Sequence, residues 1–204
     1  MFSKFLEQDT TYKTQLRDFP QWHRGVKYFG FWAIEVSNKD CIDKIKKYQE
    51  YLKEELHLNY FRQPHITLDT EGLLLDNYLE DGKIKKKIDQ IMKSNIKSFT
   101  LQLTNCNSFN ICPYLTINDP FDKLNTIRKY LNVSVDEYNP FIYIPHITLG
   151  FYNGIYKTSS IVKKISNFNL PNIEFTVNEI VFAQYETKDI QGEYEVLYRI
   201  KLKD

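Results

Sequence analysis

The chain has 204 residues, of which 42% are hydrophobic and 26% are charged, a balance typical of one globular domain and not of a disordered, collagen-like or rod-shaped chain. Its 27 lysines and arginines face 26 aspartates and glutamates, and the net charge of +1 argues against the broad positive field that binds long nucleic acid. The seven glycines form neither a GxxxxGK[ST] loop nor a GxGxxG turn, which argues against P-loop NTPases and Rossmann dinucleotide enzymes.

The first half of the chain predicts a strand, a helix, a second strand and a second helix. Aromatic and β-branched residues favour a buried strand over residues 28–36. Apolar residues recur at helical spacing between Asn38 and His57, and the lysines on the opposite face indicate a surface helix. A short strand around Ile66 and an amphipathic helix over about 82–94 follow.

The second half predicts a similar alternation, with further strands at its end. Alternating side chains favour strands over residues 98–104 and 111–117. Asp119 followed by Pro120 predicts a helix that is capped by the aspartate and has the proline at its first position. The remaining expected elements are a strand around Ile147, a helix capped by Thr158 or Ser159, and two strands over residues 173–185 and 194–202.

A repeated pentapeptide indicates that the chain is duplicated. Pro-His-Ile-Thr-Leu occupies residues 64–68 and again residues 145–149, at the same place in each half. A chance repeat of five residues is expected on the order of once in a hundred chains of this length. Each copy also contains one of only four histidines in the chain.

The two copies place a histidine and a threonine on one face of each predicted strand. Residues i and i+2 of a strand point the same way, so His65 lies beside Thr67 and His146 lies beside Thr148. If the two strands face each other across a cleft, two imidazoles and two hydroxyls surround one site. One imidazole could then remove a proton from an oxygen that attacks phosphorus, and the other could protonate the leaving oxygen. The hydroxyls could donate hydrogen bonds to the non-bridging phosphate oxygens.

A metal centre and a serine hydrolase are the rival interpretations of these motifs. Each HxT supplies only one strong metal ligand, no HExxH or Cys/His cluster is present, and Asp69 is the only obvious carboxylate on the same strand face. No GxSxG elbow occurs. We therefore expect neither a metal nor another cofactor.

The motifs resemble those of the two-histidine (2H) phosphoesterase superfamily, the LigT-like or 2′-5′ RNA ligase group. The resemblance covers nearly the whole chain, and its most specific stretches are RQPHITL at residues 62–68 and YIPHITLG at residues 143–150. Tyr-Leu at residues 114–115 leading into Asn-Asp-Pro at residues 118–120 is similar to the strand-to-helix junction of a bacterial subgroup.

The resemblance implies an α+β, bilobal duplicated fold. Two lobes of antiparallel sheet with outer helices would surround a central cleft that carries both motifs. The chain would form a single domain, with one lobe over about 26–105, the other over about 109–202, and the final strands crossing between them.

The resemblance also implies metal-free catalysis by His65 and His146, with phosphate contacts from Thr67 and Thr148. The expected reaction is hydrolysis of a 2′,3′-cyclic phosphate or a 2′-5′ phosphodiester bond in a small nucleotide or RNA end. Alternatives are a hydrolase of cyclic oligonucleotide second messengers of antiviral signalling and a catalytically idle nucleotide- or RNA-binding module. The intact pair of motifs favours an enzyme.

Two further residues are candidates for substrate binding. Tyr152 follows His146 and Thr148 at alternate positions, and Gly150 leaves room between them, so the tyrosine ring could stack on a base. Arg62 could face the phosphate as a cation.

The sequence also indicates a compartment and a partner. It has no run of about 18 apolar residues, and its first residues lack the apolar core of a signal peptide. Cys41, Cys106 and Cys112 form neither an even disulfide set nor a CxxC pair, which fits a reducing environment. We expect a cytoplasmic monomer that binds a nucleotide or short RNA, and neither long duplex nucleic acid nor a membrane.

Overall fold

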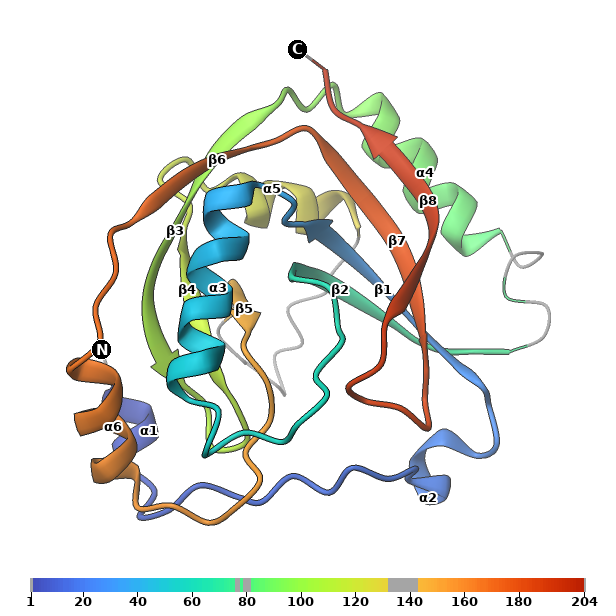
Figure 1. Ribbon diagram of the computed structural model, residues 1–204. Coiled ribbons are helices and arrows are strands. Elements are labelled where there is room, and N and C mark those ends of the chain that lie inside the picture. Colours follow the sequence, from blue (N-terminus) through green and yellow to red (C-terminus); the bar gives the residue numbers. More distant parts are fainter. Residues whose placement is uncertain (1, 76–77, 79–81, 132–142, 204) are drawn as a thin grey trace.

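A computed structural model describes residues 2–75, 78, 82–131 and 143–203. Figure 1 shows strands wrapped around the centre of the molecule with helices on the outside. In chain order the elements are α1 (Ser3–Leu6), α2 (Pro20–His23), β1 (Tyr28–Glu35), α3 (Lys39–Tyr51), β2 (His65–Leu74), α4 (Lys83–Lys93), β3 (Phe99–Ser108), β4 (Pro113–Asn118), α5 (Lys123–Tyr130), β5 (His146–Thr148), α6 (Thr158–Ser166), β6 (Ile173–Val177), β7 (Glu179–Glu186) and β8 (Tyr194–Lys201).

The strands form two antiparallel sheets of four strands each. Sheet I has the order β2-β1-β7-β8, and sheet II has the order β5-β4-β3-β6. The two motif strands, β2 and β5, each lie at an edge of their sheet, and they contact each other. The predicted α+β architecture of two antiparallel sheets is confirmed, and the duplication brings the two copies of the pentapeptide to the junction between the sheets.

The chain exchanges strands between the sheets near its end. The sequence pattern predicts one strand over residues 173–185, but the structure divides it at Asn178 into β6 and β7. β6 pairs with β3 in sheet II, whereas β7 pairs with β1 and β8 in sheet I, so the prediction of a single strand is wrong. Figure 1 shows β6 passing over the top of the view into β7. Side chains alternate in the same way before and after such a crossing, so the sequence pattern does not reveal where the chain passes from one sheet to the other.

Two predicted helix starts also differ from the structure. α5 begins at Lys123 and not at Pro120, because a turn at residues 120–121 intervenes. The Asp119 carboxylate still caps this helix, since its Oδ2 accepts the backbone N–H of Leu124 at 2.7 Å. α6 begins at Thr158 itself, with Lys157 at the cap position, whereas the sequence pattern predicts Thr158 or Ser159 as the cap. The Thr158 hydroxyl instead donates to the Gln8 carbonyl at 2.7 Å.

Two groups of buried side chains lie on opposite faces of sheet I. The larger core joins both sheets to the helices and includes Trp32, Ile34 and Ile66. The smaller one, which we call the aromatic floor, includes Phe31 and Tyr194. Because side chains alternate along a strand, His65 lies on the floor side while Ile66 points into the main core. All three cysteines are buried and unpaired. None of the described helices is long and apolar enough to cross a membrane.

Candidate active site

His65 is the first residue of β2, and its imidazole contacts a backbone carbonyl and two aromatic rings. Its Nδ1 lies 2.7 Å from the carbonyl oxygen of Gln63, two residues earlier in the chain. The rings of Phe31 and Tyr194 from the aromatic floor each have centroids 5.3 Å from the imidazole centroid. These contacts fix the ring in one orientation.

His146 has the same environment in the other half of the molecule. Its Nδ1 lies 2.7 Å from the carbonyl oxygen of Ile144, also two residues earlier. The rings of Phe109 and Tyr114 have centroids 5.1 Å from the imidazole centroid. The duplication has therefore preserved the setting of each histidine as well as its position in the sequence.

The shared carbonyl contact assigns the proton on each ring. A carbonyl oxygen only accepts hydrogen bonds, so Nδ1 must carry the hydrogen in both His65 and His146. In the neutral ring this leaves Nε2 with a free lone pair, and in the charged ring Nε2 holds the second proton. Each imidazole can then accept or release a proton at Nε2 without losing its anchor.

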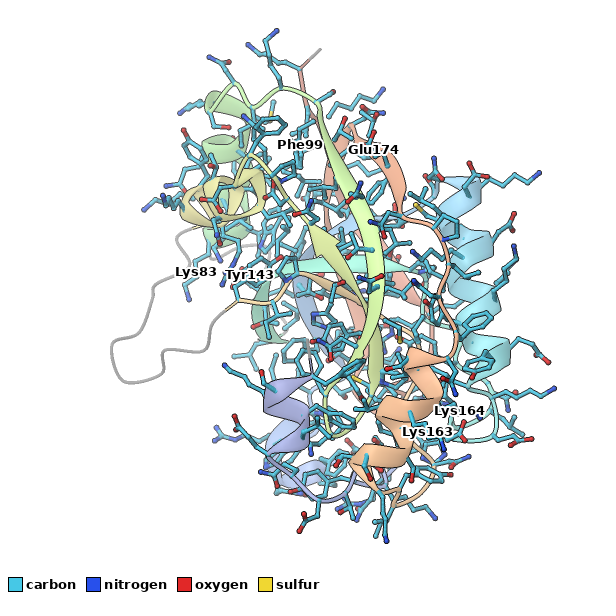
Figure 2. The ribbon with its side chains drawn as sticks, turned by 90° about the vertical axis from the view of Figure 1, so that its left-hand side faces the viewer. Lys83, Phe99, Tyr143, Lys163, Lys164 and Glu174 are labelled. Carbon is cyan, nitrogen blue, oxygen red and sulfur yellow. The ribbon has the colours of Figure 1, made fainter. Side chains whose placement is uncertain are left out.

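The structure brings the two histidines close enough to interact electrostatically. The positive form of His146 lowers the pKa of His65, and β2 contacts β5. Tyr143, which precedes His146, also donates its hydroxyl hydrogen to the Thr67 carbonyl at 2.9 Å. Figure 2 shows Tyr143 in this region, beside β2. The structure therefore brings the two motif strands together, and the gathering of both imidazoles and both hydroxyls around one phosphate stays a prediction.

Burial dominates the protonation of both histidines. It lowers the pKa of His65 to about 4, against the raising effect of the Gln63 carbonyl, and the nearby positive charges of Arg62 and His146 also lower it. Burial lowers the pKa of His146 as well. Burial therefore favours the neutral form of both rings in the free protein, and a bound anion would raise both pKa values.

The two threonines lie in different surroundings. Thr67 lines a cavity of about 610 Å³ together with His146. Thr148 does not line that cavity. Its hydroxyl lowers the pKa of the Cys112 thiol, although burial raises this pKa to about 12. His65 also lies outside the lining of this cavity.

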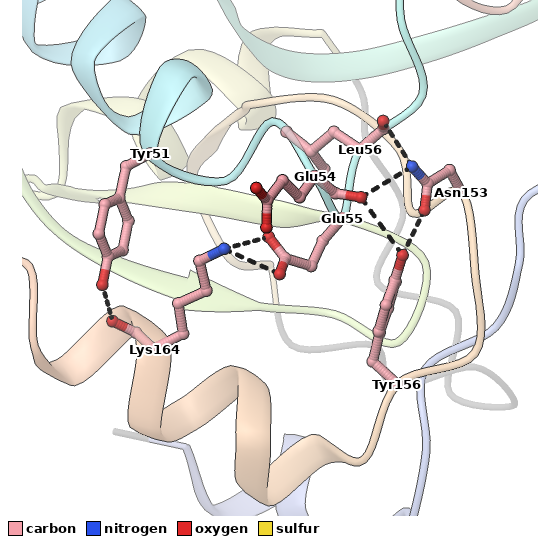
Figure 3. A network of polar contacts seen from close by, with 7 residues as sticks. All are labelled: Tyr51, Glu54, Glu55, Leu56, Asn153, Tyr156 and Lys164. Atoms are coloured by element: carbon pink, nitrogen blue, oxygen red, sulfur yellow. Dashed lines mark hydrogen bonds and ion pairs between the residues drawn. The ribbon is translucent and has the colours of Figure 1, made fainter.

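A polar network connects the segment that leads to the first motif with the segment that follows the second. The Lys164 ammonium contacts both carboxylate oxygens of Glu55 at 2.7 and 2.8 Å. The Asn153 amide donates to the carbonyls of Glu54 and Leu56 at 3.0 and 2.9 Å. Figure 3 shows these contacts between the end of α3 and α6. They connect the two halves of the chain to each other.

Arg62 lies near His65, and its guanidinium also forms hydrogen bonds with the loop between β7 and β8. Its Nε donates to the Gly192 carbonyl at 2.7 Å, and Nη2 donates to the Asp189 carbonyl at 3.1 Å. The guanidinium carbon lies 4.0 Å from the centroid of the Tyr185 ring. The guanidinium thus fixes the β7–β8 connection, and its predicted contact with a phosphate stays a prediction.

Tyr152 cannot stack on a base in this structure. Its side chain is 0% exposed, and its hydroxyl lies 2.7 Å from the Ser108 hydroxyl inside the protein. The prediction assumed that the strand continues past Thr148, but β5 ends there and Gly150 has φ +145°, which breaks the alternation of side chains. The space beside Gly150 is filled by Leu56, 3.3 Å from where a Cβ would lie.

Replacing Tyr152 with phenylalanine should therefore change stability and not catalysis. The variant removes a buried hydrogen bond to Ser108, and the expected loss is about 1 kcal/mol in the free energy of unfolding. Chemical denaturation measures the loss, and kcat/KM on a cyclic nucleotide should equal that of the wild type. A drop in kcat/KM by tenfold or more in folded protein would restore Tyr152 to the site.

Two arginine–tyrosine pairs were not identified from the sequence. Arg128 stacks on Tyr143 with its guanidinium carbon 3.8 Å from the ring centroid, as Arg62 stacks on Tyr185. Arg62 and Tyr143 occupy equivalent positions of the repeat, three residues before each histidine. Aligning the two halves outward from the pentapeptide would have singled out both positions, but not their partners from other strands and helices.

Among the described residues, no three side chains of histidine, cysteine, aspartate or glutamate come together as a metal-binding group. The sequence pattern places Asp69 on the face of His65 and Thr67, but a β-bulge sets Asp69 opposite Trp32 while Thr67 lies opposite Ala33. The Asp69 carboxylate is paired with Lys87 at 3.1 Å. The groups that the two motifs bring to the site are imidazoles and hydroxyls.

The comparisons with known proteins agree with this geometry. Residues 35–189 match the model of the 2′-5′ RNA ligase superfamily. No curated protein sequence matches the chain. The solved structures that match are about 15% identical in sequence to this chain, so their likeness establishes the fold alone. TT0787 of Thermus thermophilus aligns with a TM-score of 0.59 and 14% identity over 86% of this chain and 98% of its own. E. coli LigT complexed with 3′-AMP aligns with a TM-score of 0.54 and 16% identity over 87% of this chain and 99% of its own.

Proposed function

The chain belongs to the 2′-5′ RNA ligase superfamily of two-histidine phosphoesterases, and from this we propose that it is a metal-independent phosphodiesterase. Its substrate would be a 2′,3′-cyclic phosphate or a 2′-5′ phosphodiester bond in a small nucleotide or RNA end. The observation that carries the proposal is the identical setting of His65 and His146, each anchored through Nδ1 at 2.7 Å on contacting edge strands. E. coli LigT, which shares the fold, has been crystallised with the nucleotides 3′-AMP and NADP+, which supports a nucleotide substrate.

The proposed reaction needs one neutral and one charged imidazole. The neutral Nε2 takes a proton from a water molecule as its oxygen attacks phosphorus. The charged Nε2 gives its proton to the ribose oxygen that leaves. After the reaction the ring that was neutral is charged, and the ring that was charged is neutral. Hydroxyls of Thr67 and Thr148 donate to the non-bridging oxygens, whose charge rises in the transition state.

The charges around the rings support His65 as the base and His146 as the acid. Arg62 is positive and lies close enough to lower the pKa of His65, which disfavours the charged form of that ring. For His146, burial lowers the pKa and the Ile144 carbonyl raises it. The reverse reaction would exchange the two roles.

This assignment predicts the pH dependence. The profile of kcat/KM reports the free enzyme, in which the pKa of His65 is about 4 and that of His146 is below 6.5. The rate should fall below about pH 4 as the base becomes protonated, and above the pKa of His146 as the acid is lost, so the bell lies on the acid side of neutrality. The anionic substrate raises both pKa values, and the kcat profile should therefore lie at higher pH.

The proposal is tested by incubating the protein with EDTA and a panel of 2′,3′-cyclic nucleotides and of 2′-5′ and 3′-5′ dinucleotides. Turnover of a cyclic phosphate or a 2′-5′ linkage in EDTA is the expected result. Loss of turnover on chelation that one divalent ion restores would assign the attack to a metal-bound hydroxide. Tight nucleotide binding with no turnover of any substrate would favour the idle binding module.

A further inference from the structure

The cavity beside His146 has the lining of a nucleoside site and not of a phosphate site alone. Its volume of about 610 Å³ is in the range of pockets that hold small molecules. The lining joins Thr67 and His146, which contact the proposed phosphate, to Asp69, Phe109 and Arg128. A nucleotide whose phosphate lies at Thr67 and His146 would therefore extend its sugar and base along these three side chains.

Phe109 presents a flat surface next to the imidazole of His146. The ring is half-buried and lines the cavity, and it is stacked on Tyr114 with centroids 4.2 Å apart and an angle of 26° between the rings. One face of Phe109 is thus covered by Tyr114 and supported by it. Stacking on an aromatic side chain is typical of sites that hold a base, but it does not distinguish one base from another.

Asp69 supplies the group that can distinguish bases. Asp69 lies on β2 two residues beyond Thr67 and is one of the residues that line the cavity, and its side chain is 17% exposed. The Lys87 ammonium contacts Oδ2 at 3.1 Å and is itself held by Glu71 at 2.7 Å. The edge of the cavity therefore presents a carboxylate that only accepts hydrogen bonds, fixed beside a cation.

From these contacts we propose that the cavity binds a guanine base, with the Asp69 carboxylate accepting from its N1–H and 2-amino group. The proposal rests on the proposed function, because it assumes a nucleotide whose phosphate lies between the two histidines. Guanine carries two adjacent N–H donors on this edge, which match the two oxygens of a carboxylate, and its O6 next to them suits a nearby ammonium. Adenine and cytosine place an unprotonated ring nitrogen beside their amino group, and uracil flanks its single N–H with two carbonyl oxygens. Each of these three bases would set an acceptor against the carboxylate.

Calorimetric titration of the full-length protein with 3′-GMP, 3′-IMP and 3′-UMP tests the proposal without requiring turnover. The wild type should bind 3′-GMP about 10- to 100-fold more tightly than 3′-UMP, since a hydrogen bond to a charged group has an effect of that size. 3′-IMP, which lacks only the 2-amino group, should bind more weakly than 3′-GMP. Equal affinities for the three nucleotides in the wild type would overturn the proposal without the use of any variant.

Asp69→Asn and Glu71→Gln form a matched pair of variants. Both remove a carboxylate that pairs with Lys87, but only Asp69 lines the cavity. Asp69→Asn should abolish the preference for 3′-GMP over 3′-UMP, and Glu71→Gln should keep it. A preference that survives Asp69→Asn, or that is lost equally in Glu71→Gln, would contradict direct recognition by Asp69.

These experiments distinguish failure of the guanine site from failure of the phosphodiesterase proposal. If the wild type prefers 3′-GMP and hydrolyses no cyclic phosphate, the guanine site stands and the phosphodiesterase proposal fails. If it hydrolyses 2′,3′-cyclic GMP and 2′,3′-cyclic UMP with equal kcat/KM and binds their products equally, the phosphodiesterase stands and the guanine site fails.

Discussion

Replacing His65 or His146 with alanine should lower kcat about 10²–10⁴-fold, the usual contribution of a single general acid or base. Each ring is held at Nδ1 by a backbone carbonyl and at its sides by two aromatic rings, so each variant removes one Nε2 from a site that otherwise stays in place. Steady-state turnover of a 2′,3′-cyclic nucleotide measures the loss, and circular dichroism checks the fold. The double variant should be little slower than the slower single variant, because the two proton transfers serve the same displacement.

His23→Ala is the control for removing an imidazole. That ring lies in α2, where its Nδ1 contacts Asp18 at 2.6 Å, and its loss should leave kcat unchanged. Near wild-type turnover in a folded His65 or His146 variant would reject the two-histidine mechanism.

In the pH profile of kcat/KM, His65→Ala should remove the acidic limb and His146→Ala the alkaline limb. The opposite pattern would exchange the roles and keep the mechanism.

The candidate catalytic histidines and threonines could be predicted from the sequence because the pentapeptide that contains them occurs twice. The pentapeptide fixes which residues share a strand face, and this local rule needs no knowledge of the rest of the fold. It holds for His65 and Thr67 because residues 65–67 of β2 pair with β1 without a register shift. It fails at Tyr152 because β5 has three residues and ends at Thr148.

The surroundings of the histidines could not be predicted, because they come from strands that are distant in the sequence. Tyr194 reaches His65 from β8, which joins sheet I only after the chain has crossed from sheet II at Asn178. Its own backbone is held by a reciprocal pair of hydrogen bonds with the Gln63 side chain, both at 2.9 Å. Pairing between strands of different halves is decided by packing of the whole domain, and side-chain alternation along one strand carries no information on it.

The pKa of His65 likewise depends on tertiary structure. Its ordinary value of about 6.5 is all that a sequence supplies. The shift to about 4 requires burial in the folded domain, and the neighbouring Arg62 and His146 add to it. The expected acid-side pH optimum is therefore a prediction of the structure and not of the motif.

Replacing Thr67 or Thr148 with valine should lower kcat about 10²–10³-fold and leave both limbs of the pH profile in place. Valine keeps the shape of threonine and removes one hydroxyl that donates to a phosphate oxygen in the transition state, and the loss of one such donor has an effect of that size. The imidazoles keep their carbonyl anchors in both variants, so their pKa values should stay the same. Rate measurements across pH separate a lower maximum from displaced limbs.

The two threonines should differ in what accompanies the loss of rate. The Thr148 hydroxyl lies close enough to the buried Cys112 thiol to lower its pKa, so Thr148→Val also removes a polar group beside that thiol and should lower the free energy of unfolding, whereas Thr67→Val should not. Serine at either position restores a hydroxyl and should recover most of the rate, and Thr100→Val, an exposed position on β3, should have no effect. Unchanged kcat in folded Thr67→Val would mean that the phosphate does not contact β2, and this result would also move the substrate away from the cavity that Thr67 shares with His146.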